Sequence, residues 1–381
     1  MNQALSQDAR TLVDSVAAFA REQLGGDVDR HDAAGEFNWE GWRKCAQFGI
    51  LGLPFPEEHG GGGVDRFTAV LAMEALARGC ADGGLVFSMN AHIWACALPI
   101  WKFGSPEQRT RHLPRLARGE AVGAFAATEP DSGSDVNSLR TRASRTDGGY
   151  RLSGTKTFVT NAPIADLLLV LATVDPAKGA GGITAFLIEK GTPGLSVGRD
   201  IPKMGLRTSP MGEVVLDDCA VGPESRLGAE GGALGLFNTV MEWERSCFLA
   251  SQVGLMTRQL DQCVRYARTR RQFGQAIGKF QQVSARIADM KIRLNASRAL
   301  LYSVAASSAR GSERLMEVAA AKVFISEAAV QSGLDAVQIH GGYGYAAEGG
   351  VERQLRDAVG GRIYSGTNEI QKTIIARCLG L

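Results

Sequence analysis

The sequence predicts an α+β fold in which a helical segment, a β-rich segment and a second helical segment follow one another. Helical periodicity dominates residues 1–122, short β-rich runs and turns replace it over residues 123–222, and it returns over residues 223–381. A chain of 381 residues can bury a substantial core in each segment. We therefore predict an N-terminal helical domain, a middle β-barrel or β-sheet domain, and a C-terminal four-helix bundle with these boundaries.

The N-terminal domain is predicted to contain several helices separated by a glycine-rich loop. A second helix begins at Asn38–Trp42, and a third covers Phe67–Arg78. Between them, Pro56–Gly63 ends in four glycines, which cannot hold a helix. No Lys-Ser or Lys-Thr pair follows, so we expect a surface loop rather than a phosphate-binding one. The first helix carries an apolar stripe formed by Val13, Val16, Ala17, Phe19 and Ala20.

A further helix begins at Phe87–Trp94 and is mostly apolar, with two polar residues among its core positions. Asn90 and His92 are either hydrogen-bonded core groups or part of the wall of a substrate pocket. We expect no stretch of the chain to approach the roughly 20 uncharged apolar residues that a membrane span needs.

The middle and C-terminal domains differ in the period of their apolar residues. The β-rich runs of the middle domain are Tyr150–Gly154, Leu167–Ala172, Ile183–Ile188 and Val214–Leu216. The helical candidates of the C-terminal domain are Leu234–Ala267, Gln281–Arg310, Arg314–Leu334 and a last helix after Thr367.

Composition excludes several classes of protein. The net charge of +2 creates no strong field, so we expect neither a nucleic acid nor a membrane surface as a partner. Residues 1–5 lack the basic and apolar regions of a secretion signal. The seven cysteines include no Cys-x-x-Cys pair and the five histidines show no ligand spacing, so we predict neither disulfides nor a metal site. These features favour a reducing, cytoplasmic location.

The segment Arg362–Gln371 has the pattern of a loop that leads into a helix. Gly366 interrupts the helical pattern, and Thr367 or Asn368 is a good N-cap for the residues that follow. The free N–H groups of a helix N-terminus can bind an anion or the polar edge of a cofactor.

This segment resembles the signature of acyl-CoA dehydrogenases, a flavoprotein family whose three-domain layout matches essentially the whole chain. The resemblance implies FAD as the cofactor, with Thr367 and Glu369 contacting it and Ser365 and Gly366 contacting the substrate. The family's catalytic carboxylate is missing, because Ser365 takes its place. A serine hydroxyl cannot remove a carbon-bound proton unaided, so either the chain is no dehydrogenase or its base lies elsewhere.

Two further segments resemble flavin-binding parts of the same family. The run from Phe125 to Asp135 resembles the segment that holds the edge of the isoalloxazine ring. Phe158 and Thr160 lie two residues apart on a predicted strand and therefore share a face. In the family an aromatic residue, usually tryptophan, and a hydroxyl pack there against the ring. From the first run, the residues implied to contact FAD or substrate are Phe125, Ala127, Thr128, Gly133 and Ser134.

The basic loop Arg268–Gly274 and the segment Gln338–Gly344 resemble segments that reach FAD from a neighbouring subunit. By itself, such a loop is either a solvated positive helix end or a set of arginines suited to pyrophosphate. The resemblance implies a homo-oligomer, usually a tetramer. The residues that it implies to reach FAD are Arg270, Gln272, Phe273, Gln338 and Gly342.

Two carboxylates on the predicted helix Leu234–Ala267 are candidates for the missing base. Glu242 and Glu244 flank Trp243 and point about 200° apart, so they cannot both face one pocket. Some family members with Gly or Ala at the Ser365 position carry the base on this helix, directly before an arginine. Glu244, followed by Arg245, matches that pattern. We therefore predict Glu244 as the base, Trp243 and Arg245 as substrate contacts, and Glu242 as a solvated carboxylate.

The resemblance implies FAD-dependent α,β-dehydrogenation of an acyl thioester, with an electron-transfer flavoprotein or oxygen as electron acceptor. Four segments look like the branch of the family that oxidises prolyl or similar aminoacyl groups on carrier proteins in natural-product biosynthesis. The alternatives are a catabolic short- or branched-chain acyl-CoA dehydrogenase and a flavin-binding relative without catalysis. The four segments are Asn161–Asp166, Trp243–Glu244, Ser365–Lys372 and Ile375–Arg377.

Overall fold

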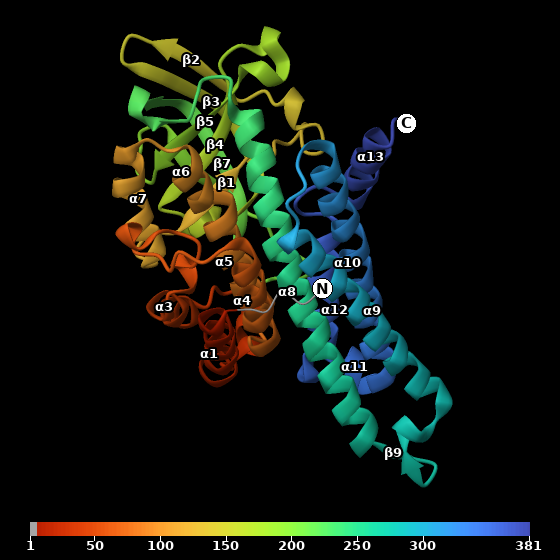
Figure 1. The fold of residues 1–381 in the computed structure, drawn as a ribbon. Helices are drawn as coiled ribbons and strands as arrows, with labels where there is room; N and C mark the ends of the chain where they lie inside the picture. Colours follow the sequence, from red (N-terminus) through yellow and green to blue (C-terminus); the bar gives the residue numbers. More distant parts are fainter. Residues whose placement is uncertain (1–5) are drawn as a thin grey trace.

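The order of helices and strands divides the protein into three consecutive parts (Figure 1). The computed structural model describes residues 6–381, so the prediction about a secretion signal at residues 1–5 lies outside the described part. Helices form the first part, a mixed β-sheet follows, and long helices form the last part. This order confirms the predicted α+β fold class.

The N-terminal helices pack around a shared apolar core. Asn38 and Asp65 cap two of them, since their side chains accept hydrogen bonds from the backbone N–H groups of Gly41 and of Phe67 and Thr68. Pro56–Gly63 is a loop with one short turn of 3₁₀-helix, as predicted. The elements are α1 (Gln7–Gln23), α2 (Val28–Ala34), α3 (Trp39–Phe48), α4 (Arg66–Gly79), α5 (Gly83–Asn90), the π-helical turns η3 (Ala91–Ala97), α6 (Leu98–Phe103) and α7 (Pro106–Ala117).

The continuous helical stretch Gly83–Phe103 corrects one expectation from the sequence. Its 21 residues are long and apolar enough, by length and composition, to cross a membrane, so the expectation that no stretch would reach this length is wrong. Most of the stretch is buried inside the protein, where it packs against β1 (Gly123–Ala126) and the long helix α8 (Ala233–Thr269). The apolar character is therefore that of a central core helix.

The two polar residues that the sequence singled out in this stretch are hydrogen-bonded core groups. Asn90 Nδ2 donates to the Val86 carbonyl oxygen at 2.8 Å, and Asn90 Oδ1 accepts from Trp94 Nε1 at 3.0 Å. His92 Nδ1 accepts from the Gly123 N–H at 2.9 Å. Complete burial lowers the pKa of His92 to about 4, so its imidazole is neutral at neutral pH.

The β-sheet is mostly antiparallel, and one of its faces has its own apolar cluster. Residues of the other face, such as Leu169 and Leu171, join the apolar cluster of the helices. Strand order is β6-β7-β3-β2-β4-β5-β8, and β1 pairs in parallel with β4. This pairing joins the end of the N-terminal helices to the centre of the sheet. The strands are β1 (Gly123–Ala126), β2 (Arg142–Thr146), β3 (Gly149–Thr160), β4 (Leu167–Thr173), β5 (Ile183–Glu189), β6 (Leu195–Asp200), β7 (Met211–Val221) and β8 (Arg226–Leu227).

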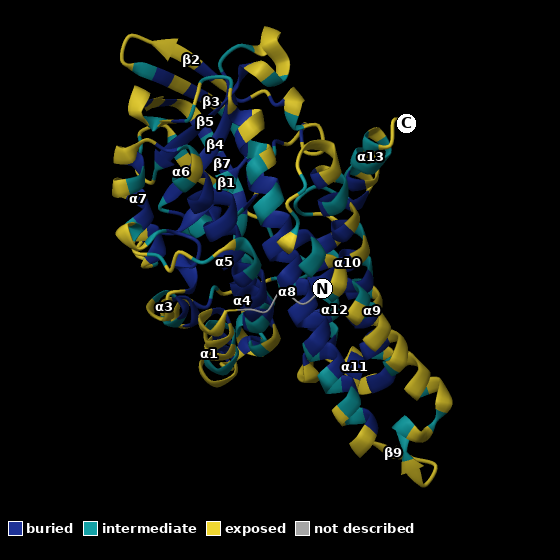
Figure 2. Ribbon diagram, in the orientation of Figure 1, coloured by how far each residue is buried: buried dark blue, intermediate teal, exposed yellow. Residues whose placement is uncertain are grey.

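Helix α8 (Ala233–Thr269) runs through the middle of the molecule and places the candidate base. It packs against α4 on one side and against α9 and α10 on the other, and Figure 2 shows that much of it is buried. Neither α11 nor α12 was predicted from the sequence. The remaining C-terminal elements are the hairpin β9 (Arg271–Gln272) and β10 (Gln275–Ala276), α9 (Gln281–Ala306), α10 (Gly311–His340), α11 (Gly342–Tyr345), α12 (Val351–Val359) and α13 (Asn368–Cys378).

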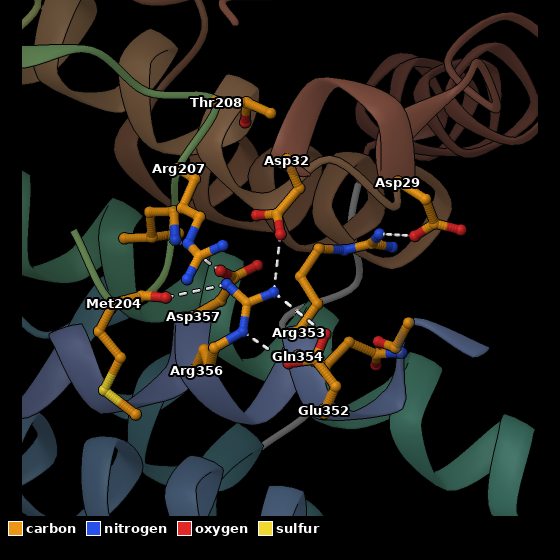
Figure 3. A network of polar contacts seen from close by, with 12 residues as sticks. Asp29, Asp32, Met204, Arg207, Thr208, Glu352, Arg353, Gln354, Arg356 and Asp357 are labelled. Carbon is orange, nitrogen blue, oxygen red and sulfur yellow. Dashed lines mark hydrogen bonds and ion pairs between the residues drawn. The ribbon is translucent and has the colours of Figure 1, made fainter. Parts of the chain in front are cut away.

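A polar network connects α12 to both other parts of the chain (Figure 3). Arg356 donates to Asp32 of α2 at 2.7 Å and to the Met204 carbonyl oxygen, between β6 and β7, at 2.8 Å. Arg353 pairs with Asp29 of α2. Because the chain leaves α12 and continues directly into the segment Arg362–Gln371, this network helps to fix the position of that segment.

Candidate active site

A cavity of about 220 Å³ lies where the sheet, α5, α8 and the segment after α12 meet. It is lined by eleven of the residues that the sequence singled out, although they come from four separate segments. These residues are Phe125, Ala127, Thr128, Gly133, Ser134, Phe158, Thr160, Glu244, Arg245, Ser365 and Gly366.

Helix α8 contributes one continuous stripe to the cavity. Phe237, Met241, Glu244 and Phe248 all line it, and their spacing of four, three and four residues places them on one helical face. The sequence reasoning missed the three apolar members. Their spacing around a single carboxylate is a signal that could have identified them, because a glutamate inside an apolar stripe must face the interior.

Glu244 is a buried carboxylate with one satisfied and one free oxygen. Its side chain is only 7% exposed, and Ser365 Oγ donates a hydrogen bond to Oε1 at 2.5 Å. The other oxygen, Oε2, is buried and has no hydrogen-bond partner among the described residues. Burial raises the pKa of Glu244 to about 7, against the opposing effects of the Ser365 hydrogen bond and the charge of Arg245. Such a group can accept a proton near neutral pH.

Ser365 is held in place from two sides. Arg245 Nε donates to its backbone oxygen at 3.0 Å, and Gln371 Nε2 donates to the same oxygen at 3.3 Å. Its φ of 56° lies in the left-handed region, which is uncommon for a residue with a side chain. These contacts fix the direction in which the hydroxyl meets Glu244.

We expect Ser365→Ala to retain most of the activity but to move the acidic limb of the pH–rate profile to higher pH. The Ser365 hydrogen bond lowers the pKa of Glu244, so its removal raises that pKa, and a higher pH is then needed to deprotonate the base. Steady-state rates measured from pH 5 to 9 would check this. A rate loss above roughly a hundredfold at high pH, the scale of acid–base assistance, would contradict it.

The structure corrects two predictions for the neighbours of Glu244. Trp243 does not line the cavity; it stacks on Trp94, with ring centroids 5.9 Å apart. Glu242 is not merely solvated: its side chain is 34% exposed, but its Oε1 accepts from Arg66 at 2.5 Å and from Arg314 at 2.8 Å. Helical spacing predicted that the two glutamates diverge, but it could not show which side chains of other helices approach each of them.

A buried ion pair holds two of the cavity-lining segments together. Lys156 Nζ donates to Glu129 at 2.7 Å and to the Ala127 carbonyl oxygen at 3.1 Å. The backbone N–H groups of Arg140 and Thr141 also donate to Glu129, at 2.6 and 2.8 Å. Glu129 is therefore engaged on both oxygens and does not offer a second free carboxylate.

Strand β3 carries an irregularity at the cavity. The register with β7 shifts between Lys156 and Val159, and Phe158 has a φ of 55° and a 60% exposed side chain. As a result Thr157 lines the cavity together with Phe158 and Thr160. Strict alternation along a strand would place Thr157 on the opposite face, which is why the sequence reasoning missed it.

Five of the other predicted cofactor residues lie away from the first cavity. Arg270, Gln272, Gln338 and Gly342 line a separate open cavity of about 550 Å³. Phe273, beside them in the hairpin at the far end of α8 (Figure 1), is 93% exposed. Near the first cavity, Thr367 Oγ1 caps α13 by accepting from the Ile370 N–H at 3.3 Å, and Glu369 is exposed in the first turn.

The comparisons with known proteins agree with this arrangement. Residues 6–120, 124–219 and 234–380 match the N-terminal, middle and C-terminal domains of acyl-CoA dehydrogenases. The chain belongs to the acyl-CoA dehydrogenase family. The predicted resemblance to this family is thereby confirmed.

Among acyl-CoA dehydrogenase relatives, two bacterial proteins are similar over nearly their whole length. The L-prolyl peptidyl-carrier protein dehydrogenase of Pseudomonas fluorescens is 44% identical, over 96% of each chain. That of a Serratia species is 43% identical, over 99% of this chain and 98% of its own. The solved structure of the prolyl acyl carrier protein oxidase AnaB has 46% identity and a TM-score of 0.95, and covers 99% of this chain and 100% of its own. PigA, solved with FAD and proline, has 42% identity and a TM-score of 0.96 over 100% of both chains.

The protein is an FAD-dependent oxidoreductase of the acyl-CoA dehydrogenase family. The residues of its cavity fit an isoalloxazine ring, which has apolar faces and a polar edge. Phe125 and Phe158 supply apolar aromatic surface, and the hydroxyls of Thr128, Thr157 and Thr160 supply hydrogen-bonding groups in the same cavity. Two-electron chemistry is thus supplied by FAD, and the chain supplies orientation and a base.

Proposed function

We propose that the protein oxidises a prolyl or similar aminoacyl group that is attached as a thioester to a carrier protein. The observation that carries this proposal is Glu244, a buried base in the cavity, combined with high similarity to relatives named for prolyl carrier-protein substrates. The product would be the corresponding α,β-unsaturated thioester. We further propose a cytoplasmic location, with an electron-transfer flavoprotein or oxygen as the final electron acceptor.

The proposed mechanism assigns one task to each residue around the reacting carbon. Glu244 removes the α-proton through Oε2, the oxygen that lacks a partner. Ser365 holds the other oxygen, and Arg245 fixes the backbone of Ser365. Bound FAD supplies the acceptor for the β-hydrogen and its electron pair. Phe237 and Phe248 line the same cavity with apolar surface and exclude water, which would otherwise compete for the base.

A neighbouring cavity supports a phosphate-bearing thioester as the substrate. It measures about 540 Å³ and shares Met241 and Arg245 with the first cavity. Three further arginines line it, together with one glutamate, Glu242. Guanidinium groups suit phosphate oxygens, so the pantetheine arm of a carrier protein or of CoA would fit this path. The three arginines are Arg66, Arg310 and Arg314.

The deciding experiment is mass spectrometry of the acyl group after incubation with the holoenzyme. One arm uses prolyl-loaded carrier protein, and the other uses a panel of short- and branched-chain acyl-CoA thioesters. We expect loss of hydrogen from the prolyl group together with anaerobic bleaching of the yellow flavin. Efficient oxidation of an acyl-CoA and none of the prolyl carrier would instead establish the catabolic alternative.

We propose that the protein is a homotetramer in which the Arg270–Phe273 and Gln338–Gly342 segments reach the FAD of a neighbouring subunit. The 93% exposed Phe273 is an unusual side chain to leave in water and supports this proposal. We expect Phe273→Ser to weaken both the oligomer and FAD retention. Light scattering coupled to gel filtration and the absorbance of bound flavin measure the two effects. A variant that keeps its oligomeric state and all its flavin would contradict the role of this residue.

A further inference from the structure

Three aromatic rings close the active-site cavity at one end. Phe87 of α5, Phe248 of α8 and Tyr364 of the segment after α12 all line it. The ring centroids are 5.1 Å apart for Phe87 and Phe248, 4.8 Å for Phe87 and Tyr364, and 5.4 Å for Phe248 and Tyr364. Each ring therefore packs against both others. We call these three residues the aromatic wall.

A second, smaller cavity lies behind the aromatic wall. Its volume is about 40 Å³, and the same three rings line it from the other side. Its lining also includes Gln252 and Arg258, whose Oε1 and Nε atoms are buried without a hydrogen-bond partner among the described residues. A space of this size suits water and not an acyl chain. Its lining is mainly apolar, with a few polar groups such as Gln252 and Arg258. The wall thus separates the cavity that holds Glu244 from this small cavity.

The aromatic wall is anchored rather than free to swing. Gln252 Nε2 donates to the Tyr364 hydroxyl at 2.9 Å and so fixes that ring from behind. Leu206, from the loop between β6 and β7, also lines the small cavity, and its N–H donates to Asp357 of α12 at 2.5 Å. Asp357 lies in the network of Figure 3, so residues from all three parts of the chain surround the wall.

We propose that the aromatic wall determines which acyl groups the enzyme accepts, by stopping the acyl group at about the length of a prolyl ring. This proposal deepens the proposed function and rests on it for the identity of the thioester. Aromatic rings are rigid and bulky, and a well-packed cluster cannot yield to an extra methylene without strain. Straight-chain acyl groups would have to displace a ring to bring their α-carbon to Glu244.

The test is to remove one ring and to measure the substrate range of the holoenzyme. Phe87→Ala joins the two cavities, so we expect the ratio of kcat/KM for a hexanoyl thioester to that for a prolyl thioester to rise. The expected rise is about ten- to two-hundredfold, the range for a methylene admitted to or excluded from an apolar pocket. Both acyl groups are attached to the same pantetheine arm, so the contribution of the arm to kcat/KM cancels in the ratio.

A binding measurement gives a readout that does not depend on turnover. S-hexyl and S-(pyrrolidinylmethyl) pantetheine thioethers lack the carbonyl and cannot be oxidised, so calorimetry reports their affinities alone. We expect Phe87→Ala to strengthen binding of the hexyl compound at least tenfold relative to the pyrrolidinyl one. Phe248→Ala should act in the same direction, and Phe87→Leu serves if the alanine variants do not fold.

Phe48→Ala is the matched control, because it removes a 37% exposed aromatic side chain of α3 that stacks on Phe19 outside both cavities. The proposal would be overturned if folded wall variants bind and use the hexyl and hexanoyl compounds, relative to the prolyl ones, no better than Phe48→Ala does. Equal use of hexanoyl and prolyl thioesters by the unaltered enzyme would also overturn it. If no prolyl thioester is oxidised but the thioether affinities shift as expected, the proposed function fails and the wall retains its role.

Discussion

Glu244→Gln is expected to abolish turnover while the yellow FAD-bound protein still forms. The amide preserves the shape of the side chain but has no basic lone pair for the α-proton, and acid–base assistance is worth about a hundred- to ten-thousandfold in rate. Most residues proposed to bind FAD lie on other segments, so flavin retention should survive. Stopped-flow measurement of flavin reduction by substrate, together with the absorbance of bound flavin, separates the two effects.

The matched control for this variant is Glu40→Gln, which alters an exposed glutamate of α3 that pairs only with Lys44 among the described residues. It should leave flavin reduction unchanged. The pH profile gives a second check, because a base with a pKa raised to about 7 is protonated and inactive below that pH. The rate should therefore fall as the pH is lowered through 7. Substantial flavin reduction by Glu244→Gln would show that another group removes the proton.

Glu129→Gln is expected to cause a large loss of stability. It leaves the fully buried ammonium of Lys156 without its charged partner, and breaking one side of a buried ion pair typically costs about 3–5 kcal/mol. Burial already lowers the pKa of Lys156 to about 8 in the presence of Glu129, so loss of the carboxylate should drive that pKa lower still. Urea denaturation followed by circular dichroism measures the change in the free energy of unfolding.

Two further variants make this prediction specific to the pair. Glu120→Gln removes an exposed carboxylate that contacts Arg118 and should produce no measurable change. The double variant Glu129→Gln with Lys156→Met removes both charges and keeps an amide oxygen for the backbone N–H groups of Arg140 and Thr141. It should recover much of the lost stability, since apolar replacement of a buried charge whose partner is gone removes the cost of burying it. If Glu129→Gln alone is as stable as the original protein, then solvent reaches the Lys156 ammonium.

Local patterns in the sequence determined the fold class, and its resemblance to a known family indicated much of the candidate site. Helical and strand periods are set by backbone geometry, so they are readable before any tertiary contact is known. The divergence of Glu242 and Glu244 followed from helical spacing alone. The eleven singled-out residues that line one cavity were indicated by the family resemblance. Short elements such as α2 and α12 escaped prediction, because seven or nine residues carry too little periodic signal.

Only the tertiary structure decided which side chains meet. The pairing of Glu242 with two arginines joins residues from α4, α8 and α10, and the Ser365–Glu244 hydrogen bond spans 121 positions of the chain. The aromatic wall and the position of Trp243 outside the active-site cavity likewise depend on contacts between distant segments. Periodicity fixes the direction of a side chain relative to its own helix or strand. Its partners, its burial and hence its pKa depend on which other elements pack against that face, and this is a property of the whole fold.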